Sequence, residues 1–231
     1  MIDPPPVLAE VFADGSGAGV CVAVVDSGIN FAHPHLLGAG RGLAVERRSD
    51  ALVVIPGAHA DRFGHGTCCA ALIHALAPLA EILAVRVTSD RPTTDGERLQ
   101  RGLEVAAEEG ARVLCVPLGA RGSLGLDGTV EALARRGVVV VAPWIDGETR
   151  PGASPGALGV GALDGVDVAL VGGRLAADPR PRPAPGIPRN FQGPSLATAR
   201  VSAAVARWLQ RLEAPPPEDL ASGFKRALTV R

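Results

Sequence analysis

The chain has 231 residues, 47% hydrophobic and 20% charged, which is enough apolar material to bury the core of a globular domain. Its formal net charge is -1, so nothing attracts it as a whole to nucleic acid or to an anionic membrane surface. No stretch reaches the ~18 uninterrupted apolar residues of a membrane helix, and the first residues lack a signal-peptide pattern. We therefore expect a cytoplasmic protein with no nucleic-acid partner and no membrane partner.

The cysteines predict buried, reduced thiols rather than disulfides or zinc ligands. Each lies inside an apolar run, and none forms a C-x-x-C spacing. They are Cys21, Cys68, Cys69 and Cys115. Histidines also occur at positions 33, 35, 59 and 74, but their spacing fits no standard zinc ligand set. We expect neither a metal nor another cofactor.

Short apolar runs rich in β-branched residues alternate with helical patterns along the chain. The predicted strands are residues 20–25, 52–55, 82–87, 113–118, 138–142 and 158–162, with 166–171 as a further candidate. This alternation is typical of βαβ units. It predicts an α/β fold with three layers, in which a mostly parallel central sheet carries helices on both faces.

Helical periodicity marks the segments between and after these strands. We predict four helices. The first starts at His65 and runs toward Pro78, the second and third lie around 99–107 and 130–134, and the last begins near Ser195 with apolar positions continuing to 212. Proline-rich breaks flank these runs but do not separate two cores. We expect one compact domain over residues 1–231, in which residues 1–17 and 214–231 are peripheral.

A glycine cluster at residues 15–19 invites a dinucleotide-binding interpretation. That motif must follow a strand and open a helix, and its third glycine lies three residues after the second. Here Val20 stands at that third position, and the glycines precede the strand. The pattern therefore excludes this phosphate site.

Polar residues at the ends of three elements remain as candidates for chemistry. Asp26 ends a buried strand, His65 begins a helix and Ser195 begins the long helix. The carboxyl edge of a parallel sheet is where open α/β proteins keep their sites. Each residue also has an ordinary structural explanation, as a turn aspartate or a helix cap.

Taken together, the three segments resemble the Asp, His and Ser motifs of the subtilisin-like serine peptidases, in that family's chain order. The motifs read Val-Ala-Val-Val-Asp-Ser-Gly at 22–28, His-Gly-Thr at 65–67 and Gly-Pro-Ser-Leu-Ala-Thr-Ala at 193–199. The resemblance extends over roughly residues 18–208. It implies a serine endopeptidase, in which Ser195 attacks, His65 transfers the proton and Asp26 orients the imidazole.

The chain departs from this family at the oxyanion hole. The family has Ala-Ala-Gly-Asn after a valine-rich strand, whereas this chain has Val-Ala-Pro followed by Trp144. The resemblance leaves the backbone N–H of Ser195 as one donor and Trp144 at the position of the asparagine. Asn190 and Gln192 are alternative donors. Loss of one such donor costs on the order of 10²- to 10³-fold in turnover.

The expected substrate segment also differs, because it reads Pro117-Leu118-Gly119 where the family has Ser-Leu-Gly. Proline removes a backbone donor from an edge that would pair with a peptide. About 19 residues precede the first strand, so we expect no prosegment. The sequence favours a slow or narrowly specific peptidase acting on a peptide or protein substrate. The alternative is a weak or inactive module that binds a peptide or a dedicated partner protein.

Overall fold

The computed structural model describes residues 8–36, 40–88, 93–121, 125–161, 168–169, 193–213 and 219–229. The arginine- and proline-rich segment 174–189, for which the sequence indicated no single role, lies outside the described residues. The alternative donors Asn190 and Gln192 lie outside them as well. Of the candidate strand 166–171, only the backbone of Val168–Ala169 is described.

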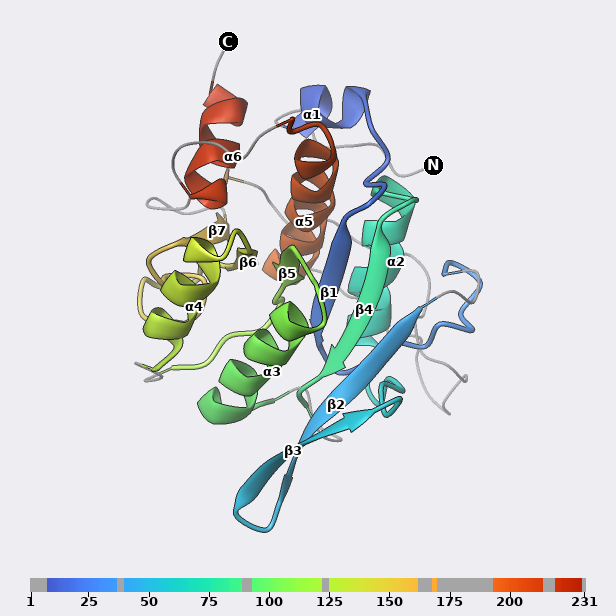
Figure 1. Ribbon diagram of the computed structural model, residues 1–231, viewed down its shortest axis with the longest axis vertical. Helices are drawn as coiled ribbons and strands as arrows, with labels where there is room; N and C mark the ends of the chain where they lie inside the picture. The colour runs from blue at the N-terminus through green and yellow to red at the C-terminus, as the bar shows by residue number, and fades with distance from the viewer. Residues whose placement is uncertain are drawn as a thin grey trace.

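A central sheet organises the molecule (Figure 1). Its strands are β1 (Cys21–Asp26), β2 (Arg41–Arg48), β3 (Ala51–Pro56), β4 (Glu81–Arg86), β5 (Val113–Cys115), β6 (Val139–Pro143), β7 (Ala157–Gly161) and β8 (Val168–Ala169). Among the described residues their order is β3-β2-β4-β1-β5-β6-β7-β8. Every neighbouring pair is parallel except β2 and β3, so the predicted mostly parallel sheet is confirmed.

Helices cover both faces of this sheet, which confirms the three-layer architecture. One face carries α1 (Ala9–Ala13), α2 (His65–Leu76), α5 (Pro194–Gln210) and α6 (Leu220–Thr229). The other carries α3 (Gly96–Glu108) and α4 (Gly125–Arg135). In β1, Val22 and Val24 pack under α2 and α5, while Ala23 and Val25 face α3. Since both faces are covered, the strand is apolar at successive positions rather than at alternate ones.

Three elements were not predicted from the sequence: β2, α1 and α6. The two helices contribute buried side chains to the core, among them Phe12 and Phe224. Within the segments 1–17 and 214–231, which we expected to be peripheral, the described helices α1 and α6 thus pack against the core. The strand predicted over 113–118 ends at Cys115, because the chain leaves the sheet there and enters the candidate site.

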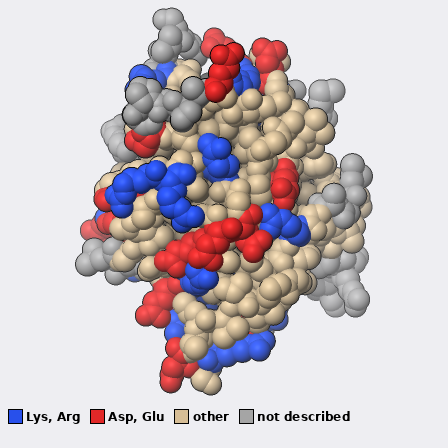
Figure 2. All heavy atoms as spheres, viewed as in Figure 1, with Lys and Arg blue, Asp and Glu red and all other residues tan. Residues whose placement is uncertain are grey.

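The face carrying α3 and α4 shows acidic and basic side chains close together (Figure 2). Two arginines of this surface are held by pairs of carboxylates: Arg41 by Glu81 and Glu109, and Arg101 by Glu104 and Glu108. At these two positions, opposite charges therefore neutralise each other locally. No helix among the described residues is long and apolar enough to span a membrane.

Candidate active site

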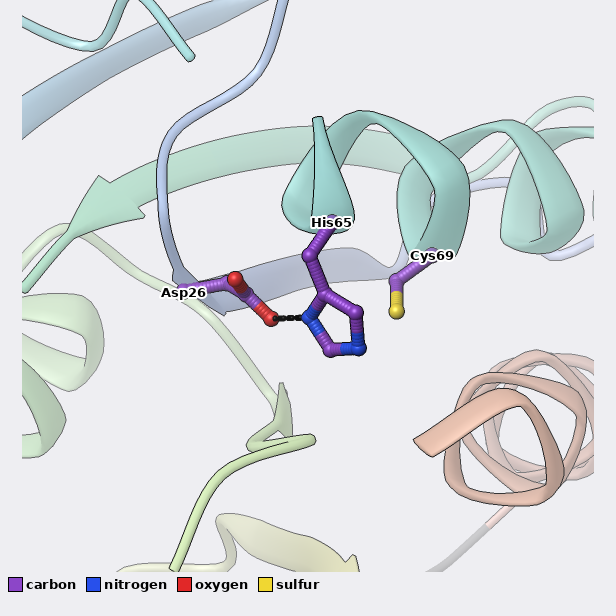
Figure 3. Close-up of side chains that lie close together, drawn as sticks. All are labelled: Asp26, His65 and Cys69. Atoms are coloured by element: carbon purple, nitrogen blue, oxygen red, sulfur yellow. Dashed lines mark hydrogen bonds and ion pairs between the residues drawn. The ribbon is translucent and has the colours of Figure 1, made fainter. Parts of the chain in front are cut away.

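Asp26 and His65 meet at the carboxyl edge of the sheet. Asp26 is the last residue of β1 and only 1% exposed, and His65 is the first residue of α2. The Nδ1 atom of His65 lies 2.6 Å from Oδ2 of Asp26 (Figure 3). A carboxylate on Nδ1 fixes the orientation of the ring and stabilises the protonated imidazole.

Two glycines allow this close approach. A Cβ atom added at Gly66 would lie 2.2 Å from the carbonyl oxygen of Gly28, and one added at Gly28 would lie 2.4 Å from the carbonyl oxygen of His59. Gly28 also has a φ of +103°, which other residues rarely adopt. The glycines that follow Asp26 and His65 in their motifs thus bring the loop after β1 against the start of α2.

Two opposing effects set the protonation of His65. Burial favours the neutral ring, but the charge and hydrogen bond of Asp26, with a further contribution from the charge of Asp61, outweigh it. The pKa of His65 is therefore raised above its ordinary value of 6.5. A ring with this environment accepts a proton more readily than a free histidine does.

Ser195 lies in the first turn of α5, where the helix dipole places a partial positive charge. α5 packs against α2, β1, β5 and β6. Its start lies at the carboxyl edge of the sheet, because Ser195 contacts Pro117, which follows the end of β5. The hydroxyl of Ser195 donates to the carbonyl oxygen of Pro117 over 3.0 Å. The structure thus places the predicted nucleophile directly at the predicted substrate segment.

The predicted substrate segment, residues 117–119, follows β5 and continues into a bridge with a second loop. Ala120 exchanges two backbone hydrogen bonds with Arg150, of 2.8 and 3.0 Å. Gly119 is packed so closely that an added Cβ would lie 2.3 Å from Cγ2 of Thr149. Asp146 accepts hydrogen bonds from the backbone and side chain of Thr149, which lower the pKa of Asp146 to about 2. We call residues 119–121 and 146–150 the clasp.

Trp144, which the resemblance predicts to stand at the position of the family's oxyanion asparagine, follows β6 directly. Its backbone N–H donates to the carbonyl of Val160 over 2.8 Å. Its indole fills the space beside β7, because a Cβ added at Gly159 would lie 3.1 Å from Cδ1 of the ring. The role of Trp144 as an oxyanion donor remains a prediction.

Asp26, His65 and Cys69 are the one set among the described residues that brings three potential metal ligands together, within 4.8 Å of one another. However, the Asp26–His65 hydrogen bond already uses one oxygen and the Nδ1 atom. Burial raises the pKa of the Cys69 thiol well above 9.0, so this thiol stays protonated, and metals bind the thiolate. The chemistry of the set favours a proton-transfer pair over a metal centre.

All four cysteines are buried free thiols, as predicted.

A buried polar network that was not predicted from the sequence lies beside the Asp26–His65 pair. Asp61 is 6% exposed and accepts hydrogen bonds from Ser27 and Thr67, which lie close to Asp26 and His65 in the chain. An acidic residue just ahead of a predicted helix start was the signal that could have identified it.

The chain is similar in sequence to known peptidases. The model of the Subtilase family (peptidase S8) matches residues 17–165, a range that includes Asp26 and His65 and ends before Ser195. Thermitase of Thermoactinomyces vulgaris is 34% identical over 143 residues, which are 56% of this chain and 48% of that protein. Subtilisin Savinase of Lederbergia lenta is 34% identical over 137 residues, 55% of this chain and 48% of that one.

Solved structures are similar in fold. A cold adapted subtilisin-like serine proteinase superposes with a TM-score of 0.73 at 23% identity, covering 90% of this chain and 82% of that one. A point mutant of the protease domain of PatA gives 0.66 at 24% identity, covering 90% and 86%. The chain spans about half the length of the two curated relatives described above. The family match over residues 17–165, together with these relatives, shows that the chain belongs to the subtilase family of serine peptidases.

Proposed function

We propose that the chain hydrolyses peptide bonds through Asp26, His65 and Ser195. The observation that carries the proposal is the 2.6 Å contact between Asp26 and His65 at the edge of the sheet where α5 begins. A serine hydroxyl is un-ionised at neutral pH, so attack needs a neighbouring base, and an oriented imidazole supplies one. His65 takes the proton of Ser195 during attack and returns it to the leaving amine.

The start of α5 stabilises the oxyanion that forms as Ser195 attacks. The backbone N–H of Ser195 and the helix N-terminus supply partial positive charge at that point. The position after β6 holds Trp144, whose side chain has an indole N–H but lacks the amide group of an asparagine side chain. With the donor set of the family reduced in this way, we propose slow turnover rather than none.

The clasp and Pro117 support a narrow specificity. Ala120 uses its N–H and its C=O toward Arg150, so a peptide that pairs with this segment adds to the opposite edge. On that edge Pro117 offers no N–H. Gly119 has both a backbone N–H and a C=O with which a peptide could pair. Its Cα is packed closely against the side chain of Thr149. Substrates must therefore bind with few backbone hydrogen bonds and fit against a fixed loop, which favours a particular peptide or protein over bulk protein.

A second candidate function is binding of a peptide or a dedicated partner protein without efficient cleavage. The observation that favours it is the hydrogen bond from Ser195 to the carbonyl of Pro117. A hydroxyl has one hydrogen, so Ser195 must turn away from Pro117 before it can donate to His65. If a partner displaces the hydrogen bond between Ser195 and Pro117, the site can cleave a peptide. If nothing displaces this bond, the site can only bind one.

Incubation with a complex peptide mixture, followed by mass spectrometry of new chain ends, separates the two functions. A peptidase generates new ends with the unmutated protein and none with Ser195→Ala. Ser202→Ala is the matched control, because Ser202 lies on the same helix and donates to the carbonyl of Thr198 over 2.8 Å. It should cleave normally. If the unmutated protein retains peptides and produces no new ends, the binding function is the correct one.

A further inference from the structure

Asp61 lies in the loop just before α2 and is surrounded by donors. Its Oδ1 atom accepts from the Ser27 hydroxyl (2.8 Å) and from the backbone N–H groups of Phe63 (2.8 Å) and Gly64 (2.7 Å). Its Oδ2 atom accepts from the backbone N–H (2.9 Å) and the hydroxyl (2.5 Å) of Thr67. Five donors converge on one carboxylate that is 6% exposed. Only an ionised carboxylate, which accepts at both oxygens, satisfies all five.

These bonds connect the chain segments that carry Asp26 and His65. Ser27 is bonded to Asp61 and also accepts from the backbone N–H of Gly66, while its own N–H donates to Oδ1 of Asp26 over 2.5 Å. Thr67 lies two residues after His65, and its hydroxyl oxygen accepts from the backbone N–H of Asn30 over 3.0 Å. The end of β1 and the start of α2 are therefore joined through one buried anion.

The charge of Asp61 also acts on the imidazole. Among the described residues, the titratable groups close to His65 include Asp26 at the end of β1, Asp61 before α2, and Cys69 on α2, whose thiol stays protonated. After the effects of burial and of Asp26, the charge of Asp61 is a further influence that raises the pKa of His65. The N-terminal end of α2 by itself disfavours a cation, and an anion at this end offsets that effect.

We propose that Asp61 is a positioning residue, which holds His65 in line with Asp26 by joining Ser27 to the first turn of α2. The proposal rests on the proposed function for its effect on catalysis, but the alignment of the pair is measurable without a substrate. The hydrogen bonds of Asp61 go to Ser27 and to residues 63–67 rather than to the imidazole of His65 or to Ser195, so Asp61 acts through the geometry and the electrostatic environment of His65.

The test uses NMR on the full chain. The pKa of His65 is measured from its ring resonances, and the Asp26–His65 hydrogen bond from the low-field resonance of the Nδ1 proton. In Asp61→Asn, an amide N–H₂ faces N–H and O–H donors and the charge is lost. We expect the pKa of His65 to fall and the Nδ1 proton to shift upfield. We also expect kcat to fall on the order of ten- to a hundredfold, while KM changes little.

Two further variants separate positioning from folding. Thr67→Val removes one hydrogen bond to Asp61 and keeps the charge, so the Nδ1 resonance should shift while the fall in pKa is smaller. Asp95→Asn is the matched control, because Asp95 caps α3 through the N–H of Arg98 at 2.8 Å, away from His65. It should leave both His65 readouts unchanged.

The proposal is overturned if folded Asp61→Asn keeps the His65 pKa and the Nδ1 resonance of the unmutated protein. If Asp61→Asn does not fold, an unchanged Nδ1 resonance in Thr67→Val overturns it. A chain with no peptidase activity whose His65 pKa still falls in Asp61→Asn would refute the proposed function and support the positioning role. If Asp61→Asn keeps peptidase activity and the His65 resonances are unaltered, the proposed function would be supported and the positioning role refuted.

Discussion

Substitution of Gly66 by alanine tests the close approach on which the Asp26–His65 pair depends. The added Cβ would lie 2.2 Å from the carbonyl oxygen of Gly28 and 3.2 Å from Cβ of Asp26. Cβ atoms in proteins keep at least 3.0 Å from such an oxygen. The difference between 3.0 and 2.2 Å means that the loop after β1 and the start of α2 must separate by about 0.8 Å.

This separation has two measurable consequences. Overpacking of a well-packed site costs about 1–3 kcal/mol, so the urea midpoint of Gly66→Ala should fall. A displacement of nearly 1 Å in a reacting pair costs up to roughly a hundredfold in rate. The rate at which a fluorophosphonate labels Ser195 should therefore fall on the order of ten- to a hundredfold in folded protein.

Gly128→Ala is the matched control. Gly128 lies within α4, is exposed, and has no atom within 4 Å of an added Cβ. Alanine should stabilise this helix by about 0.5–1 kcal/mol and leave labelling unchanged. If Gly66→Ala matches the unmutated protein in urea midpoint and labelling rate, the reasoning about the close approach is wrong.

The site and the core support three further predictions. Because neutral His65 is the base and its raised pKa keeps the ring protonated to higher pH, labelling of Ser195 should rise with pH to a plateau reached above 6.5; a flat profile from pH 5 to 9 contradicts general-base catalysis. Trp144→Asn should raise kcat by about 10²- to 10³-fold if it restores an oxyanion donor, and no gain would mean that another group or the cleft limits turnover. Phe224→Ala removes a fully buried ring whose centroid lies 5.5 Å from that of Trp208. The free energy of unfolding, measured with urea, should fall by about 3–5 kcal/mol, while the labelling rate of folded protein should not change. A fall below about 1 kcal/mol would show that this packing contributes little.

The apolar strands were predictable because both faces of the sheet are buried. Residues 20–25 and 138–142 were predicted as strands and correspond to β1 and β6, each shifted by one residue. β2 escaped detection because arginines stand at both of its ends and only its middle is buried. The partners of Arg41 and Arg47 are carboxylates 40 or more positions away, so the pattern of β2 alone gives no sign of them.

The candidate site was predictable to the level of its motifs. The family resemblance implied that Asp26 orients His65, and the contact between the two side chains is consistent with that pairing. The sequence marked Asp61 only as an acidic residue ahead of a predicted helix start. Its hydrogen-bonding role was not predictable, because that role depends on the close approach of the loop after β1 and the start of α2 at Gly28 and Gly66. The clasp depends on a bridge between residues 120 and 150, which no local pattern marks.

The central claim is that Ser195 is a nucleophile activated by the Asp26–His65 pair. Intact-mass measurement after fluorophosphonate treatment tests it most directly, since the probe needs no knowledge of the substrate. We expect a single adduct on the unmutated protein, none on Ser195→Ala, and much slower formation on His65→Ala. Absence of an adduct between pH 6 and 9, in protein shown to be folded, would contradict it.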